Sequence, residues 1–284
     1  MQDFKGKTAV ITGGGSGIGR AMGELFLAKG MQVVLADIEE KALDATVAAL
    51  SASGGRCIGV VTDVSKAADV QHLAAAALAE FGAIHIACNN AGVFAGGLLW
   101  EESLADFQWL LDVNVWGVIH GIRTFVPIMA GQDSECHIVN TASMAAVTAM
   151  PYSGIYHMTK HAVLGLSESL YHELAFHVPN VKVSVLCPEA INTGIAASER
   201  NRPRAYSSAG DIVESDARTL VTQALADSVA SGLGPEVMAQ RVFDAIVAGR
   251  FYILSEEAWR ETANVRLDDI RLGRNPTFAP PVNL

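Results

Sequence analysis

The sequence predicts an α/β fold in one domain, built on a parallel sheet with helices on both faces. Short apolar runs rich in β-branched residues alternate along the chain with longer segments of helical periodicity. These runs are nearly continuously apolar, as parallel strands are when helices cover both faces of their sheet. A glycine-rich turn directly after the first run is typical of the same class of fold.

Four strands and three helices are expected in the first half of the chain. Apolar residues recur at helical spacing between the apolar runs, and glycines mark the ends of the first and third helices. The expected strands are Thr8–Thr12, Gln32–Ala36, Cys57–Val61 and Ala83–Cys88. The expected helices are Ile18 to the stop at Gly30, Lys41–Leu50, and Lys66–Phe81 followed by Gly82.

The second half continues the alternation. Ser103 and Asp106 form a capping-box signature, which predicts the start of a helix that reaches about Met129. Pro235 after Gly234 suits the first turn of a later helix. The other expected elements are the strands His137–Thr141, Val181–Leu186 and Phe251–Leu254 and the long helix Ser153–Phe176.

Two segments, residues 194–234 and 256–284, fall outside this alternation. The simplest interpretation is one catalytic domain over residues 1–255, which includes a substrate lid at about 194–234. Residues 256–284 then form a C-terminal tail extension. At 284 residues the chain is long for an average domain, but α/β folds of about 250 residues are common as single domains.

The composition argues against several classes of protein. Half of the residues are apolar and only 9 are proline, which excludes a disordered chain. The net charge of −10 without a Lys/Arg run argues against nucleic acid or a membrane as partner. We expect no secretory signal, because the amino terminus is charged, and a cytoplasmic location, because the four scattered cysteines form no CxxC pair.

The turn between the first strand and the first helix has the sequence TGGGSGIG, residues 12–19. Glycine is needed where the backbone takes a positive φ or lies close to a ligand, and a helix amino terminus offers free N–H groups to a pyrophosphate. In this strand–turn–helix context the turn predicts a dinucleotide site, the alternative being a flexible turn without a ligand. The expected coenzyme contacts are Gly13, Gly15, Ser16, Gly17, Ile18 and Gly19.

Asp37 closes the second strand, where a carboxylate accepts hydrogen bonds from the adenosine ribose. A 2′-phosphate there would meet like charge in a poorly solvated site. Ile38, Glu39 and Glu40 follow and Ser16 is not basic, so no cation near in sequence can hold that phosphate. We therefore predict NAD rather than NADP, with Asp37 and Ile38 at the ribose. An ordinary turn-forming aspartate is the alternative.

A second group of polar residues, separate from the glycine turn and Asp37, lies in the middle of the chain. Tyr156 and Lys160 are four apart on a predicted helix, so both side chains project from one face. Ser143 directly follows the fifth strand, and Asn114 lies within the preceding helix. Taken singly, each of these residues could be a packing or turn residue, but their joint order and spacing favour a catalytic set.

With these residues the chain resembles the short-chain dehydrogenase/reductase family, in its compact single-domain branch, from Lys5 to about Leu254. The resemblance rests on the turn at 12–19, Asp63-Val64, Asn89-Asn90-Ala91-Gly92, Asn114, Ser143 and Tyr156-His-Met-Thr-Lys160. It implies a Rossmann-type, doubly wound parallel sheet of about seven strands and a homo-oligomer, a tetramer or a dimer. It further implies that Asp63 and Val64 contact the adenine, that Asn90, Ala91 and Gly92 line the coenzyme near its ribose, and that Pro188, Ile191 and Thr193 contact the nicotinamide.

The chemistry expected of this set is proton transfer coupled to hydride transfer. A free phenol titrates near pH 10, too high for an efficient base at neutral pH. The ammonium of Lys160 one helical turn away and a positive nicotinamide would favour the phenolate of Tyr156. Ser143 would hydrogen-bond the substrate oxygen, Lys160 would also hold the nicotinamide ribose, and Asn114 would anchor a water that relays protons.

Two features leave alternatives open. Glu189 stands where the family usually has glycine, and its carboxylate either contacts a polar substrate group or points to solvent. Val93, Met144 and Tyr152 either line an apolar substrate pocket or belong to the core. His157 and His161 have metal-ligand spacing, but no third ligand follows at motif spacing, so we expect no metal.

The leading prediction is an NAD-dependent oxidoreductase that oxidises a secondary alcohol, with an aryl or alicyclic alcohol as the narrower expectation. The expected partner is thus a small-molecule alcohol or ketone. The alternatives are an NADP-linked ketone reductase and a coenzyme-sensing binding protein without catalysis. Turnover with NAD against NADP separates the first two, and Tyr156→Phe tests the third.

Overall fold

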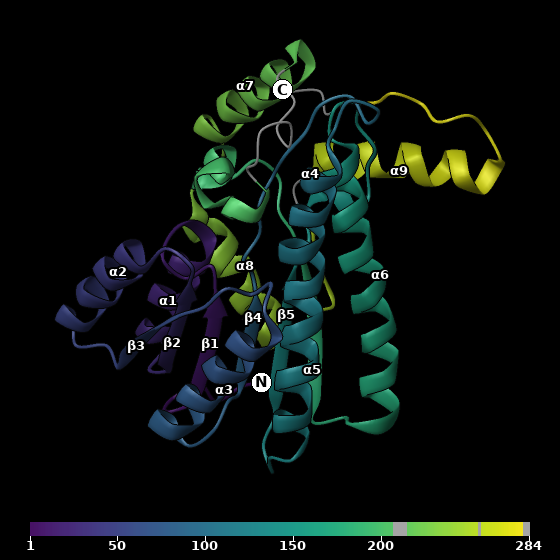
Figure 1. The fold of residues 1–284 in the computed structure, drawn as a ribbon. Coiled ribbons are helices and arrows are strands. Elements are labelled where there is room, and N and C mark those ends of the chain that lie inside the picture. Colours follow the sequence, from purple (N-terminus) through teal and green to yellow (C-terminus); the bar gives the residue numbers. More distant parts are fainter. Residues whose placement is uncertain (207–214, 255–256, 281–284) are drawn as a thin grey trace.

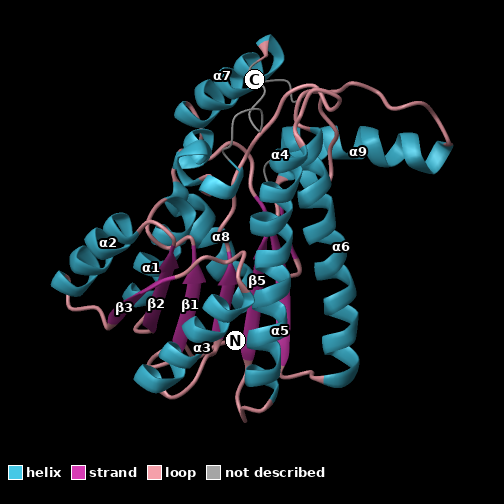
Figure 2. Ribbon diagram, viewed as in Figure 1, coloured by secondary structure: helices cyan, strands magenta, loops and turns pink. Residues whose placement is uncertain are grey.

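The computed structural model describes residues 1–206, 215–254 and 257–280, and within them seven parallel strands form one sheet (Figures 1 and 2). The strand order is β3-β2-β1-β4-β5-β6-β7. The strands are β1 Thr8–Thr12, β2 Gln32–Asp37, β3 Cys57–Val61, β4 Ile86–Asn89, β5 Cys136–Thr141, β6 Val181–Cys187 and β7 Tyr252–Leu254. The Rossmann-type sheet expected from the sequence is confirmed.

Helices cover both faces of the sheet (Figure 2). On one face lie α1 Gly17–Ala28, α2 Glu40–Ala52 and α8 Pro235–Ala248, and on the other α3 Ala67–Phe81, α5 Gly117–Ala130 and α6 Gly154–His177. The remaining α-helices of the described residues are α4 Leu104–Leu110, α7 Asp216–Ala230 and α9 Glu257–Leu272. Figure 1 shows α9 running outward beyond the end of α6.

The order of the strands reverses between β1 and β4. Val10 of β1 pairs with Val34 of β2 on one side and with Ala87 of β4 on the other. The chain builds the sheet outward from β1 to β3, then returns to the centre and builds it outward from β4. The loops after β1 and β4 therefore diverge to opposite faces, and such a switch point is where open α/β sheets bind ligands.

The crossover at the end of the sheet has an unusual hand. Helices α1 and α8 pack together on one face, with Met22 and Phe26 in the same core cluster as Met238 and Val242. The chain moves outward in one direction from β1 to β2 and in the other from β6 to β7. The β6–α8–β7 crossover therefore has the opposite hand to β1–α1–β2, whereas nearly all such crossovers share one hand.

Two elements differ from expectation. Strand β4 begins at Ile86 rather than Ala83, because the side-chain amide of Gln132 takes both the N–H (3.0 Å) and the carbonyl (2.8 Å) of Ile84. The helix expected to run unbroken from Ser103 to Met129 contains a π-helical segment, η1, over Leu111–Trp116. The capping box at its start is present as predicted.

The α4–η1–α5 stretch, Leu104–Ala130, is long and apolar enough by length and composition to cross a membrane. In this fold its apolar face is covered, because Phe125 and Met129 are buried in the cluster that α3 and α6 form with the sheet. A core helix of this kind passes the same test of length and composition.

The segment expected as a lid is helical where it is described. It holds the 3₁₀-helices η3 Gly194–Asn201 and η4 Arg204–Tyr206, followed by α7. In Figure 2 these elements lie beyond the tips of the strand arrows, at the carboxyl edge of the sheet. The position of residues 194–206 and 215–230 therefore suits a cover over a cleft at this edge.

Candidate active site

The glycine turn between β1 and α1 leaves space for a ligand next to the backbone. Gly13 and Gly17 have φ of +65° and +52°, which favours glycine. A Cβ on Gly19 would lie 2.1 Å from the Gly13 carbonyl oxygen, so no side chain fits. The N-cap residue Ser16 makes no capping hydrogen bond, and the first turn of α1 holds no acidic residue. The free N–H groups at this helix end can therefore bind an anion.

Hydrogen bonds join the two loops of the switch point. Thr12 Oγ1 accepts from the N–H groups of Asn90 (2.9 Å) and Ala91 (3.1 Å), and Asn90 Nδ2 donates to the Thr12 carbonyl at 3.0 Å. Thr141 Oγ1, at the end of β5, donates to Asn90 Oδ1 at 3.2 Å. The predicted contacts Asn90, Ala91 and Gly92 line one cavity with Gly13. The contributions of Thr12 and Thr141 were not predicted.

The acidic residues expected at the adenosine end line the same cavity. Asp37 Oδ2 accepts from the N–H of Gly15 at 2.9 Å, so the carboxylate is fixed against the glycine turn. Asp63 Oδ1 accepts from the N–H (3.1 Å) and hydroxyl (2.6 Å) of Ser65. Lys66 Nζ lies 3.2 Å from Asp63 Oδ2. Ile38 and Val64 line the cavity beside these two carboxylates.

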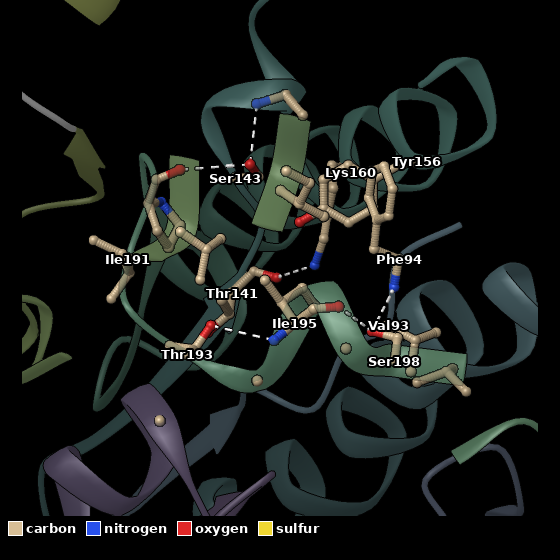
Figure 3. A pocket seen from close by; sticks show the side chains of 18 of the residues that line it. Val93, Phe94, Thr141, Ser143, Tyr156, Lys160, Ile191, Thr193, Ile195 and Ser198 are labelled. Carbon is tan, nitrogen blue, oxygen red and sulfur yellow. Dashed lines mark hydrogen bonds between the residues drawn. The ribbon is translucent and has the colours of Figure 1, made fainter. Parts of the chain in front are cut away.

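Ser143, Tyr156 and Lys160 converge on the other end of this cavity (Figure 3). The helical spacing places Lys160 Nζ 5.5 Å from the centroid of the Tyr156 ring. Lys160 Nζ donates to the Thr141 carbonyl at 3.1 Å and is only 3% exposed. Ser143 Oγ donates to the Pro188 carbonyl at 3.4 Å and accepts from the N–H of Ala145 at 3.1 Å. The set predicted from spacing is thus assembled by β5, α6 and the loop after β6.

The protein's own groups favour the neutral phenol. Burial raises the pKa of Tyr156 to about 12, and the hydrogen bond with Ser143 only partly opposes that rise. Burial lowers the pKa of Lys160 to about 8. The lowered phenol pKa expected from the sequence also depends on a positive nicotinamide, which would offset part of the cost of burying the phenolate. A positive charge from outside the chain is needed to offset that cost.

Asn114 lies in the π-helical segment η1 and is fully buried. Its Oδ1 accepts from the N–H of Val93 at 2.9 Å, and its Nδ2 donates to the Val93 carbonyl (2.9 Å) and to Thr159 Oγ1 (3.2 Å). A Cβ on Gly92 would lie 3.3 Å from Asn114 Oδ1 and 3.4 Å from Lys160 Nζ. Asn114 therefore fixes the loop after β4. Its Oδ1 and the Nζ of Lys160 both lie close to Gly92.

The cavity has a volume of about 950 Å³, and most of its remaining wall is apolar. The Phe94 ring packs 5.2 Å from that of Tyr156, centroid to centroid. Tyr152 takes a φ of +63°, and its carbonyl accepts from the N–H of Gly97 at 2.8 Å. Such strain is common next to functional sites. The wall includes the expected Val93, Met144, Tyr152, Pro188, Ile191 and Thr193, together with Leu220, Val221 and Leu225 of α7 and Trp259 and Phe278 of the tail.

Glu189 is largely buried at the edge of this cavity. Its Oε1 lies 3.0 Å from Nη1 of Arg241, on α8. Of the two alternatives left open, neither anticipated this ion pair, because Arg241 lies 52 residues further along the chain. Glu189, at the position where the family usually has glycine, therefore forms an ion pair with Arg241 of α8.

A cluster of charged side chains attaches the lid to the start of α4. Arg202, which is 2% exposed, pairs with Asp106 and, at 2.6 Å, with Glu199. Arg218 of α7 pairs with Asp106 at 3.2 Å, with Glu199 at 2.7 Å and with Glu102 at 3.5 Å. Asp106 and Glu199 thus occupy the guanidinium of Arg202. Burial raises the pKa of Glu102 to about 7.

The paired histidines have other partners. His157 Nδ1 is hydrogen-bonded to the Ala145 carbonyl at 2.8 Å, and His161 Nδ1 to the His157 carbonyl at 2.8 Å. In residues 1–206, 215–254 and 257–280, no three His, Cys, Asp or Glu side chains converge in the manner of a metal site.

Comparisons with known proteins agree with this geometry. A family model described as short chain dehydrogenase matches residues 7–204. The structure of a short chain dehydrogenase/reductase from Burkholderia phymatum in complex with NAD is 49% identical, with a TM-score of 0.96 over 100% of both chains. A 1-deoxy-11-beta-hydroxypentalenate dehydrogenase from Streptomyces exfoliatus is 33% identical over 97% of this chain and 91% of its own. A 2,5-dichloro-2,5-cyclohexadiene-1,4-diol dehydrogenase from Sphingobium indicum is 41% identical over 68% of this chain and 76% of its own.

Proposed function

Because the chain belongs to the short-chain dehydrogenase/reductase family, we propose that it uses NAD to oxidise an apolar secondary alcohol to a ketone, in a reversible reaction. The observation that carries this proposal is the convergence of Ser143, Tyr156 and Lys160 on the cavity that also reaches the glycine turn and Asp37. Groups for proton transfer and groups for a dinucleotide thus share one site. The relatives named as dehydrogenases of a cyclohexadiene diol and of a hydroxypentalenate support alcohol oxidation.

The residues present fit NAD. The turn leaves backbone N–H groups open at the end of α1, and Gly19 lets this helix end pack directly against the Gly13 carbonyl. The Asp37 carboxylate lines the adenosine end, where it suits ribose hydroxyls and repels a 2′-phosphate. The chemistry that NAD supplies when bound is acceptance of a hydride by its nicotinamide ring.

In the proposed mechanism Tyr156 takes the proton of the alcohol hydroxyl as the substrate is oxidised and returns it in the reverse reaction. The Ser143 hydroxyl donates to the alcohol oxygen and holds it against the phenol. The buried phenolate is stabilised by the Lys160 ammonium, 5.5 Å from the ring, and by the positive nicotinamide. Lys160 also binds the nicotinamide ribose, and Asn114 anchors a water next to Gly92 that carries the proton onward.

The walls of the cavity favour a bulky apolar substrate. Phe94, Met144 and Tyr152 line the cavity, and α7 and the tail add further apolar side chains. Ion pairs with Asp106 of α4 occupy Arg202 and Arg218 of the lid, and Arg241 pairs with Glu189. The apolar wall matches an aryl or alicyclic secondary alcohol, and the Glu189–Arg241 pair at its edge is proposed to influence which ring substituents are accepted.

A screen of secondary alcohols with NAD, followed by NADH formation, tests the proposal. Alicyclic and aryl alcohols should be turned over with higher kcat/KM than short linear ones, and NAD should be preferred to NADP. Preferential turnover of ketones with NADPH would instead identify the chain as a ketone reductase. Tight NADH binding without turnover of any alcohol or ketone would identify a coenzyme-sensing protein.

The proposal includes a homo-oligomer, a tetramer or a dimer, in the cytoplasm. Trp116, Tyr171 and Phe176, on η1 and α6, leave 47%, 44% and 80% of their surfaces exposed. Apolar side chains exposed on neighbouring helices are typical of subunit contacts. Light scattering during gel filtration should give a mass of two or four chains, and a monomer at micromolar concentration would rule this part out.

A further inference from the structure

The loop after β2 and the beginning of the lid meet at the adenosine end of the cavity. One carboxylate oxygen of Glu39, Oε1, lies 2.7 Å from Nη2 and 3.0 Å from Nε of Arg200. Asn201 Nδ2 donates to the same oxygen at 2.8 Å. Three donors thus converge on a single acceptor, although Glu39 and Arg200 are 161 residues apart.

Backbone groups anchor both sides of this contact. Arg200 Nη1 donates to two carbonyl oxygens of η3, at 2.7 and 2.9 Å, which holds the guanidinium against the lid. The N–H of Glu39 donates to Asp37 Oδ1 at 3.0 Å, while Asp37 Oδ2 accepts from the N–H of Gly15. A continuous chain of hydrogen bonds therefore runs from the glycine turn through Asp37 and Glu39 to the lid.

Exposure distinguishes this contact from the other attachment of the lid. The side chains of Glu39 and Arg200 are 32% and 40% exposed, whereas those of Arg202 and Asp106 are 2% and 0% exposed. A solvent-exposed ion pair contributes little stability and opens at little cost, but separating a buried one leaves an uncompensated charge. The lid is therefore held firmly at Asp106 and reversibly at Glu39.

Asp37, Glu39, Arg200 and Asn201 all line the cavity at this end. We propose that Glu39, Arg200 and Asn201 form a clasp that closes over the adenosine ribose of NAD and couples coenzyme binding to the position of the lid. This inference rests on the coenzyme site of the proposed function. Because Glu39 occupies the guanidinium of Arg200, the clasp also withholds that cation from the 2′-phosphate of NADP.

The first test is NADH binding in the absence of alcohol, measured by calorimetry on the full chain. Glu39→Ala and Arg200→Ala should each raise the Kd for NADH by about fivefold or more, a usual size for coupling between sites. The double variant should bind no more weakly than the weaker single variant, because both changes remove one contact. Glu40→Ala, at the next and exposed position, is the matched control and should leave the Kd unchanged.

The second test compares NADPH with NADH. Glu39→Ala releases Arg200, so the ratio of the NADPH Kd to the NADH Kd should fall by about tenfold, the effect of one well-placed charge pair. Adding Arg200→Ala should restore the ratio. Glu39→Gln keeps an acceptor for Asn201 and should fall between wild type and Glu39→Ala. Hydrogen exchange should show that NADH protects the amides of residues 194–206 in the wild type and less so in Glu39→Ala.

Single variants that bind NADH like the wild type would overturn the clasp, as would a double variant whose effect is the sum of the two. Circular dichroism melting confirms that each variant is folded. If Glu39→Ala does not fold, the milder Glu39→Gln takes its place in the test. No alcohol is present in these measurements. If the wild type turns over no alcohol but the single and double variants bind NADH as expected, the proposed reaction would be refuted and the clasp would stand.

Discussion

At the scale of single residues, the proposed mechanism depends first on the Tyr156 hydroxyl. Tyr156→Phe keeps the ring that packs against Phe94 and removes only the group that accepts the proton. We expect kcat/KM for alcohol oxidation to fall by about 100-fold or more, the usual contribution of a general base. The Kd for NADH should change by less than about twofold, since a phenyl ring fills the same space. Steady-state kinetics with calorimetric binding measures both quantities, and an active phenylalanine variant would remove Tyr156 from the mechanism.

Lys160 should make stability depend on pH. Its pKa is lowered by burial to about 8, from 10.5 in the unfolded chain, so the unfolded state binds more protons between these values. The contribution of Lys160 to stability therefore rises with pH across this window, and it is lower below pH 8, where the folded protein holds a buried ammonium. Lys160→Met should be more stable than the wild type at pH 7, by about 1–3 kcal/mol.

Urea unfolding from pH 7 to 9.5 measures this effect. The stability of the wild type relative to Lys160→Met should rise with pH, and the methionine variant should also lose activity. Lys182→Met, at an exposed position on β6, is the control and should follow the wild type. A methionine variant less stable than the wild type at pH 7 would show that the hydrogen bond to Thr141 outweighs the cost of burying the charge.

The convergence of the proposed catalytic residues on one cavity could be predicted from the sequence, because a local rule places them. Helical spacing brings Tyr156 and Lys160 onto one face, and the ends of parallel strands meet at one edge. The pairs Glu39–Arg200 and Asp106–Arg202 span 161 and 96 residues, and no local pattern signals them. The raised pKa of Tyr156 in the chain alone could not be predicted for a related reason, because burial depends on residues from several elements.

At the scale of elements, the attachment of the lid to α4 should respond to pH through Glu102. Burial raises its pKa to about 7, from 4.5 in the unfolded chain, so the folded state binds more protons between these values. Stability should therefore fall as the pH rises from about 4.5 to 7. Glu102→Gln keeps the shape and removes the titration, so it should be more stable than the wild type at pH 7 and above, by about 1 kcal/mol.

Thermal melting at pH 5 and pH 8 checks this expectation. The gap between Glu102→Gln and the wild type should be wider at pH 8 than at pH 5. Glu101→Gln, the neighbouring residue, should leave the wild-type dependence intact. If Glu102→Gln is destabilised at pH 8, the carboxylate is needed there as a charged partner of Arg218.

The elements were predictable where periodicity and caps agree. The capping box at Ser103 and the glycine stop at Gly82, which takes a φ of +79°, both lie where expected. The π-helical segment at Leu111–Trp116 was missed; it contains the buried Asn114, whose side chain forms hydrogen bonds with Val93. Those bonds are tertiary, so the sequence of the helix alone does not indicate them.

At the scale of the whole molecule, the C-terminal extension is part of the active-site wall. Trp259 packs against the cluster around Met144 and Val163 and also lines the cavity. Trp259→Ala should lower kcat/KM for bulky ring alcohols by about tenfold and change that for small alcohols far less, since lost apolar contact penalises the larger substrate. Trp100→Ala removes a tryptophan that is 80% exposed and should leave both values unchanged. Equal losses for large and small alcohols would exclude Trp259 from substrate selection.

The order in which the molecule can be completed follows from the packing of α1 against α8. Met22 and Phe26 are covered by Met238 and Val242, which lie more than about 200 residues further along the chain and are synthesised later. Phe4 likewise stacks 4.7 Å from Phe243. A nascent chain that ends before residue 235 therefore exposes the apolar side of its first helix. This half of the core is therefore closed to water only after α8 has been synthesised, and until then the growing polypeptide is prone to aggregation unless chaperones bind it or α8 follows quickly.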